Sequence, residues 1–159
     1  MAYEQLKLEN QLCFPVYAAS RLIIREYQPH LDKLGITYSQ YLVLMVLWEK
    51  DSIAVSEITE RLILNTNTVT PILKRMEAQG LITRQRSASD ERKVIITLTP
   101  GGRQLQAEAA SIPEQMVSGL DSEDSKVADL QKLKEQLSVI IRYLLEKSGV
   151  VDSQSVEIV

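Results

Sequence analysis

A single short stretch of strand-like sequence interrupts an otherwise helical pattern, and this interruption limits the possible folds most. Apolar residues recur at three- and four-residue steps before residue 79 and again after residue 99, which is typical of helices. Residues 81–86 and 93–98 look like strands, and the second carries the β-branched run Val94, Ile95, Ile96 and Thr97. The polar stretch Ser87–Arg92 suits a hairpin tip between them. We therefore expect a mainly α fold with a small β-hairpin.

Capping residues and prolines set the expected helix boundaries. Thr37 and Gln40 form a capping box for a buried helix that ends near Glu49. Thr99 followed by Pro100 is a good helix start. The expected helices are 8–29 with Pro15 near its first turn, 37–49, 57–64 capped by Ser56, 65–78 ended by Gly80, 99–112 ended by Pro113, and a last helix that opens at 121–124 and stops at Gly149; residues 53–55 are expected to be extended.

Two short helices followed by a hairpin form a winged helix-turn-helix, and the charge of the chain gathers there. The whole chain of 159 residues has a net charge of −3, which argues against a protein that is basic all over. Residues 61–93 nevertheless hold seven basic and three acidic side chains, a net charge of +4. Screening limits the reach of charge to about 8–10 Å, so a local basic patch can bind a polyanion on an acidic protein.

The second helix of the pair and the hairpin carry the side chains that suit double-stranded DNA. A helix that enters a major groove about 12 Å wide needs small, hydrogen-bonding residues at its start and cations further along. An arginine on a thin hairpin can enter the minor groove while a neighbouring carboxylate holds its guanidinium. Each feature alone has a simpler interpretation as a helix cap or a solvated turn. Together they predict DNA contacts from Thr66, Asn67, Thr68, Thr70, Lys74, Arg75, Arg84, Arg86, Asp90 and Arg92.

Short strings spread over residues 8–105 resemble the MarR family of winged-helix repressors, and more closely its organic-hydroperoxide-sensing OhrR branch. The matching strings are Leu8–Phe14, Tyr17–Arg21, Ile36–Leu42, Thr68–Glu77, Gly80–Ile82 and Asp90–Arg92. The resemblance implies one MarR-type domain over residues 1–159, a DNA-binding part at 53–98, and dimerisation helices at 1–35 and 100–148. It also implies a homodimer on a pseudo-palindromic operator.

The lone cysteine, Cys13, is the candidate sensor. A single Cys and a single His exclude a disulfide within the chain and a Cys- or His-rich metal site, so we expect no metal and no cofactor. On its residues alone, Cys13 has a simpler interpretation as core filler. The resemblance implies instead that Tyr27 and Tyr38 donate hydrogen bonds to its sulfur. Cys13 and Tyr27 lie fourteen residues apart on one predicted helix, about 21 Å, so that contact requires a second subunit.

The hypothesis is a repressor that leaves its operator when an organic hydroperoxide oxidises Cys13 to a sulfenic acid. No second cysteine is present, so a small thiol is expected to form a mixed disulfide. The controlled gene is expected to encode a peroxide-detoxifying enzyme. No signal peptide or membrane-spanning run is apparent, and a lone free thiol favours the cytoplasm.

Other interpretations stay open at this stage. The chain could be a MarR-type repressor of a small phenolic ligand, or a broader thiol-based regulator of oxidative stress or virulence. We do not expect an enzyme, because a one-cysteine thiol peroxidase would need an activating group that Arg21 and His30 supply poorly. A purely structural helical dimer would leave the basic hairpin unexplained.

Overall fold

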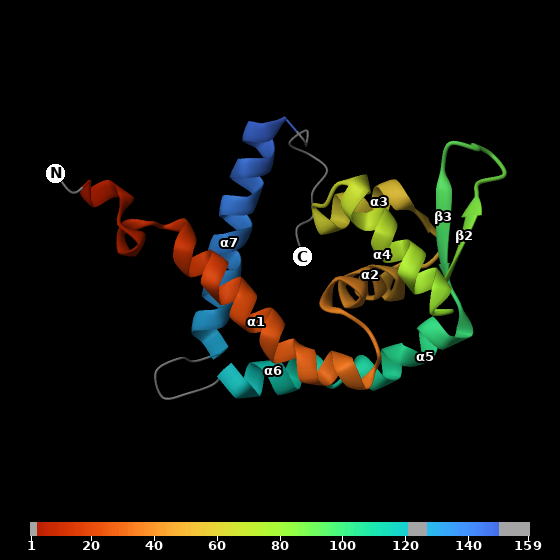
Figure 1. Cartoon of the computed structure of the whole chain (residues 1–159), viewed down its shortest axis with the longest axis horizontal. Helices are drawn as coiled ribbons and strands as arrows, with labels where there is room; N and C mark the ends of the chain where they lie inside the picture. The colour runs from red at the N-terminus through yellow and green to blue at the C-terminus, as the bar shows by residue number, and fades with distance from the viewer. Residues whose placement is uncertain (1–2, 121–126, 150–159) are drawn as a thin grey trace. The chain divides into compact units, whose positions relative to one another are not determined.

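The computed structural model describes residues 3–120 and 127–149. Contacts divide the chain into two compact units, Met1–Ile112 and Pro113–Val159. The first contains α1 (Cys13–Lys33), α2 (Tyr38–Glu49), β1 (Ile53–Ala54), α3 (Val55–Leu62), α4 (Thr66–Ala78), β2 (Ile82–Arg86), β3 (Val94–Leu98) and α5 (Pro100–Ala109) (Figure 1). Helices α6 (Ile112–Leu120) and α7 (Val127–Ser148) follow. The expected mainly α fold with a β-hairpin is confirmed.

Helix α2 forms the centre of the first unit because its sequence is apolar on every side. Val43, Leu44 and Leu47 of α2 are fully or almost fully buried. They share the core with Ile58 from α3 and with Leu73 from α4. A fully buried side chain of this size contributes about 1.5–3 kcal/mol. These contacts hold α3 and α4 beside α2 (Figure 1).

The sheet is antiparallel, with strand order β1-β3-β2. Ile53 is opposite Ile96, while Ile82 and Arg86 of β2 are opposite Leu98 and Val94 of β3. We call β2, β3 and the connecting residues 87–93 the wing. Figure 1 shows it extending beyond the end of α4.

The first helix differs from its expected bounds at both ends. Single 3-10 turns at Glu4–Leu6 and Leu8–Asn10 precede α1, which begins only at Cys13. This start places Pro15 in the first turn, where its missing N–H has no helical partner to lose. Pro29 does not end α1, which continues to Lys33. Leu31 in the added turn is completely buried, and this packing outweighs the effect of the proline.

Three further boundaries, at the two ends of α3 and at the end of α5, also differ from the expected ones. Ser56 does not cap α3, which begins at Val55 directly after the strand pair that keeps Ala54 extended. The same helix ends at Leu62, because Ile63 adopts a left-handed conformation with φ of 54°. Helix α5 ends at Ala109, and Pro113 lies in the first turn of α6 rather than ending a longer helix. The expected start at 121–124 lies outside the described residues.

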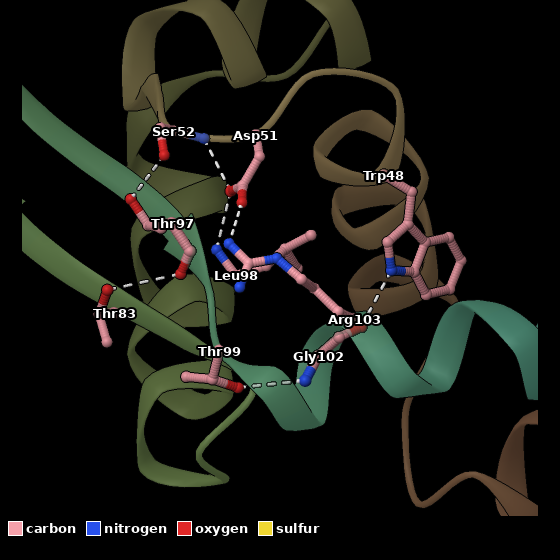
Figure 2. Close-up of polar contacts among 9 residues, drawn as sticks. All are labelled: Trp48, Asp51, Ser52, Thr83, Thr97, Leu98, Thr99, Gly102 and Arg103. Carbon is pink, nitrogen blue, oxygen red and sulfur yellow. Dashed lines mark hydrogen bonds and ion pairs between the residues drawn. The ribbon is translucent and has the colours of Figure 1, made fainter.

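Asp51 fastens the base of the wing to helices α2 and α5 (Figure 2). Its Oδ1 accepts the backbone N–H groups of Ser52 at 2.7 Å and Leu98 at 2.8 Å, and its Oδ2 accepts Arg103 Nη2 at 2.7 Å. Burial opposes ionisation of this carboxyl, but the three donors outweigh it and hold the pKa of Asp51 below its ordinary value. Trp48 Nε1 completes the attachment by donating to the Gly102 carbonyl at 2.9 Å.

Gly102 is required where α5 begins. Thr99 Oγ1 accepts the Gly102 N–H at 3.1 Å and donates to the Gly80 carbonyl at 2.6 Å, so the first turn of α5 lies against the start of β2. A Cβ at Gly102 would overlap the Leu81 carbonyl oxygen, whereas a Cβ at Gly101 would meet nothing closer than 3.6 Å.

We expect Gly102→Ala to lower the free energy of unfolding by about 1–3 kcal/mol, because the backbone must move to admit the methyl group. Gly101→Ala is the matched control and should raise it by about 0.5–1 kcal/mol, since alanine reduces the entropy of the unfolded chain. Urea unfolding of both variants measures the difference. Equal stability of the two variants would contradict the close approach of α5 and β2.

Asp51→Asn should lower the free energy of unfolding at pH 7 by about 1–2 kcal/mol. The folded pKa of Asp51 lies below its unfolded value near 3.8, so its stabilisation is complete above that pH and is lost as the pH falls through the folded pKa. The difference between wild type and Asp51→Asn should therefore shrink below about pH 4. Urea unfolding from pH 2.5 to 7 tests this, and two parallel pH profiles would refute it.

Candidate nucleic-acid interface and thiol site

The start of α4 is an exposed, electropositive helix terminus. Asn65 is its N-cap, and Asn65 Oδ1 accepts the Thr68 N–H and the Thr68 hydroxyl, each at 2.9 Å. The hydroxyl of Thr68 therefore already forms a hydrogen bond within the helix cap. Thr66 and Asn67 are exposed in the first turn, where free backbone N–H groups favour a phosphate or a base acceptor.

One face of α4 is buried and the opposite face is open. Val69, Leu73 and Met76 lie in the core. Asn67, Pro71, Lys74 and Arg75 are exposed, while Thr70 is only partly exposed. Asn67, Pro71 and Lys74 are spaced by four and three residues, so they share one face. Pro71 places an apolar ring between two polar side chains of this face, a feature that the sequence analysis missed although the helical spacing shows it.

The wing presents an arginine at its tip. The Arg92 side chain is 92% exposed, and its Nε donates to Asp90 Oδ1 at 3.1 Å. The Arg92 N–H donates to the same oxygen at 3.2 Å. The side-chain and backbone bonds from Arg92 hold the pKa of Asp90 below its ordinary value. Because the contact uses Nε, the carboxylate holds the guanidinium by its stem and leaves the terminal nitrogens to other partners.

The other two arginines of the wing are placed differently from each other. Arg84 is 23% exposed, and its Nη1 pairs with Glu77 of α4 at 3.4 Å. Its Nε is buried without a hydrogen-bond partner among the described residues. Arg84 thus joins the wing to α4, whereas Arg86 is exposed at the end of β2.

The candidate sensing residues form two separate groups. Cys13 is the first residue of α1 and is exposed. Tyr27 and Tyr38 lie together, with ring centroids 5.2 Å apart in an edge-on arrangement. Cys13 and Tyr27 belong to the same continuous helix, so about 21 Å of helix axis separates them. Within one chain the structure brings the two phenols together and keeps the thiol away from Tyr27.

Tyr41 extends the phenol pair into a cluster that the sequence analysis did not include. Its ring centroid lies 5.9 Å from Tyr27 and 6.4 Å from Tyr38, and it contacts Trp48 at 6.2 Å. Burial raises the pKa of all three phenols, and their mutual repulsion adds to this effect for Tyr38 and Tyr41. They therefore remain protonated at neutral pH and can donate hydrogen bonds to an anion. The three-residue step from Tyr38 to Tyr41 is the signal that could have revealed this neighbour.

Other chemistry finds little support in the described part of the chain. No cluster of His, Cys, Asp or Glu with the makings of a metal site occurs within residues 3–120 and 127–149. None of the helices in these ranges combines the length and apolar character of a membrane span.

Comparison with known proteins identifies the family. Residues 25–109 match the model of the SarA/Rot transcriptional regulators. The chain is 47% identical to the organic hydroperoxide resistance transcriptional regulator of Bacillus subtilis (strain 168), over 92% of this chain and 97% of that protein. Its structure is similar to reduced AbfR bound to DNA, with a TM-score of 0.73, 40% identity, and coverage of 91% of this chain and 99% of that one. AbfR of Staphylococcus epidermidis is also known in a disulfide form, which matches with a TM-score of 0.59, 42% identity, and coverage of 87% and 95%.

These matches confirm the resemblance that the residue strings predicted. The HTH-type transcriptional regulator MgrA of Staphylococcus aureus is similar as well, with 37% identity over 82% of this chain and 89% of its own. The chain belongs to the MarR and SarA family of winged-helix transcriptional regulators.

Proposed function

We propose that the chain is a homodimeric DNA-binding repressor that releases its operator when an organic hydroperoxide oxidises Cys13. The observation that carries the proposal is the contact between the rings of Tyr27 and Tyr38, since Tyr27 lies about 21 Å along α1 from the thiol of the same chain. A second subunit can bring its Cys13 to these donors. The relatives support this role, since one is named for organic hydroperoxide resistance and another is known in reduced and disulfide forms.

The DNA-binding part of the proposal follows from the exposed residues of α4 and the wing. The first turn of α4, with Thr66 and Asn67, enters the major groove, and Lys74 and Arg75 reach phosphates or a guanine edge. Arg92 enters the neighbouring minor groove, where the negative potential is strongest. In a dimer, two such units read half-sites about 34–36 Å apart, hence a pseudo-palindromic operator. The reduced form of AbfR is known on DNA, which supports this assignment.

Exposed apolar residues support the dimer. Leu6, Leu8 and Leu12 before α1, and Phe14 and Val16 within it, expose between 38% and 86% of their surfaces in the isolated chain. Exposed apolar area on this scale marks an association surface. We assign residues 1–35, together with 100–148, to the dimer contacts around one MarR-type domain.

The sensing chemistry needs only two external reactants. The Cys13 thiolate attacks the outer oxygen of the hydroperoxide, the O–O bond breaks, and a proton converts the leaving alkoxide into an alcohol while the sulfur becomes a sulfenic acid. A small thiol then displaces water and leaves a mixed disulfide on Cys13. The thiolate that accepted the phenol hydrogen bonds is replaced by a larger neutral group, which disrupts the contacts at the subunit boundary. These steps suit the reducing cytoplasm and require no enzymatic turnover, so we assign the chain a regulatory role and not a thiol peroxidase activity.

The Cys13→Ser variant tests the sensor. It should bind a duplex from the region upstream of its own gene as wild type does, and it should stay bound after treatment with cumene hydroperoxide and a small thiol. Wild type should lose about tenfold or more in affinity, because displaced phosphate contacts each weaken binding. Gel shifts measure both proteins. Release of Cys13→Ser by the hydroperoxide would exclude the thiol mechanism, and its release by a phenolic compound would favour a ligand-controlled repressor.

Arg92→Ala tests the wing. Binding should weaken by about 1–3 kcal/mol, and the slope of log K against log salt should fall by about 1 for each subunit. Lys50→Ala, which removes an exposed cation just after α2 and outside the residues assigned to DNA and dimer contacts, is the control and should change neither quantity. Fluorescence anisotropy at several salt concentrations gives both values. An unchanged salt slope for Arg92→Ala would show that the wing tip does not contact the duplex.

A further inference from the structure

A buried amide links the first turn of α2 to the end of α4. Gln40 is 4% exposed and is the one buried polar side chain among the residues that the structure describes. Its Oε1 accepts the Thr37 N–H at 2.9 Å, which completes the capping box of α2. Its Nε2 donates to Gln79 Oε1 at 2.6 Å, and Gln79 Nε2 donates to the Gly35 carbonyl at 3.1 Å. Gln79 is the residue that caps the C-terminus of α4.

The capping box alone does not explain a glutamine at this position. Glutamate would accept the Thr37 N–H equally well, and its charge would favour the N-terminus of a helix. What glutamate lacks is the second half of the amide, the donor that reaches Gln79. A buried amide is tolerated only when both its donor and its acceptor are paired. The link to α4 is therefore the specific property that Gln40 adds.

The phenol cluster shares this turn. Tyr38 lies between Thr37 and Gln40, and its ring contacts Tyr27 at a centroid distance of 5.2 Å. A displacement of the Tyr38 backbone would move the capping box, and a bond of 2.6 Å is lost when its atoms separate by about 1 Å more. The phenol cluster and α4 are thus connected through residues 37–40 and one hydrogen bond, from Gln40 to Gln79.

We propose that Gln40 and Gln79 are positioning residues that transmit the state of the sensing thiol to the recognition helix. In the reduced protein, the bond between them fixes the C-terminal end of α4. Oxidation that moves Tyr38 breaks or shifts this bond and frees that end of α4 from its DNA-binding position. The inference rests on the proposed function, since it names the path by which oxidation at Cys13 reaches α4.

The test compares the reduced and oxidised affinities of variants that differ at this link. Gln79→Met keeps the length of the side chain and removes both amide groups. Gln40→Glu keeps the acceptor for Thr37 and removes the donor for Gln79. Ser39→Ala is the control, because Ser39 is exposed in the same turn of α2 and lies outside the link, the DNA-binding part and the residues assigned to the dimer contacts. Fluorescence anisotropy with a duplex from the upstream region gives Kd before and after treatment with cumene hydroperoxide and a small thiol.

Both link variants should reduce the ratio of oxidised to reduced Kd at least tenfold relative to wild type, whereas Ser39→Ala should keep the wild-type ratio. A merely structural role would lower thermal stability without changing this ratio, so thermal unfolding is measured beside it, and Kd is measured well below the unfolding temperature. A wild-type ratio in both link variants would overturn the inference and leave the proposed function intact. A wild type that ignored the hydroperoxide would overturn the proposed function and this inference together.

Discussion

The burial of α2 is the constraint on which the rest of the first unit depends. Its apolar residues contact α3, α4 and α5, so all three of these helices are positioned against α2. At each end of α2, polar side chains form hydrogen bonds to other elements. At its start, Gln40 binds the end of α4. At its end, Trp48 and the following Asp51 bind α5 and β3.

This arrangement explains how the two candidate DNA-binding parts, α4 and the wing, keep a fixed spacing. Helix α4 is attached at the start of α2, and the base of the wing is attached just after its end. Because α2 is a buried, regular helix of twelve residues, the distance between these attachments cannot change without disturbing the core. A small movement at either end would therefore change the relation between α4 and the wing, the two parts that we propose contact DNA.

The sequence predicts the elements whose signals are local. The caps Thr37, Asn65 and Thr99 all occur where the pattern places them, because each needs only a side-chain oxygen and an N–H two or three residues away. The C-terminal end of α1 and the start of α3 could not be predicted this way. The first depends on the burial of Leu31, and the second on strand pairing that fixes Ala54.

The candidate site likewise combines features that local sequence signals predict with features that depend on contacts between distant residues. The polar start of α4 and the arginine at the wing tip follow from residue type and spacing, since exposure on a short helix or hairpin is almost assured. The contact of Gln40 with Gln79 joins residues 39 positions apart, and no periodicity marks such a pair. Arg84 and Arg86 carry the same charge, so composition cannot distinguish their roles. In the structure, Arg84 pairs with Glu77 of α4.

In the proposed mechanism, the hydrogen-bonding chemistry of the phenols decides which state of the thiol they favour. Phenols are protonated at neutral pH, and burial raises the pKa of Tyr27 and Tyr38 further, so both can donate a hydrogen bond to a neighbouring anion and offer much less to a neutral group. A thiolate is such an anion, whereas a mixed disulfide is neutral and larger. In the proposed mechanism, these donors lose a charged partner once Cys13 has reacted. Reduction of the disulfide by a thiol would restore the thiolate and the proposed contact, so the two states would differ by a charge on a single sulfur atom.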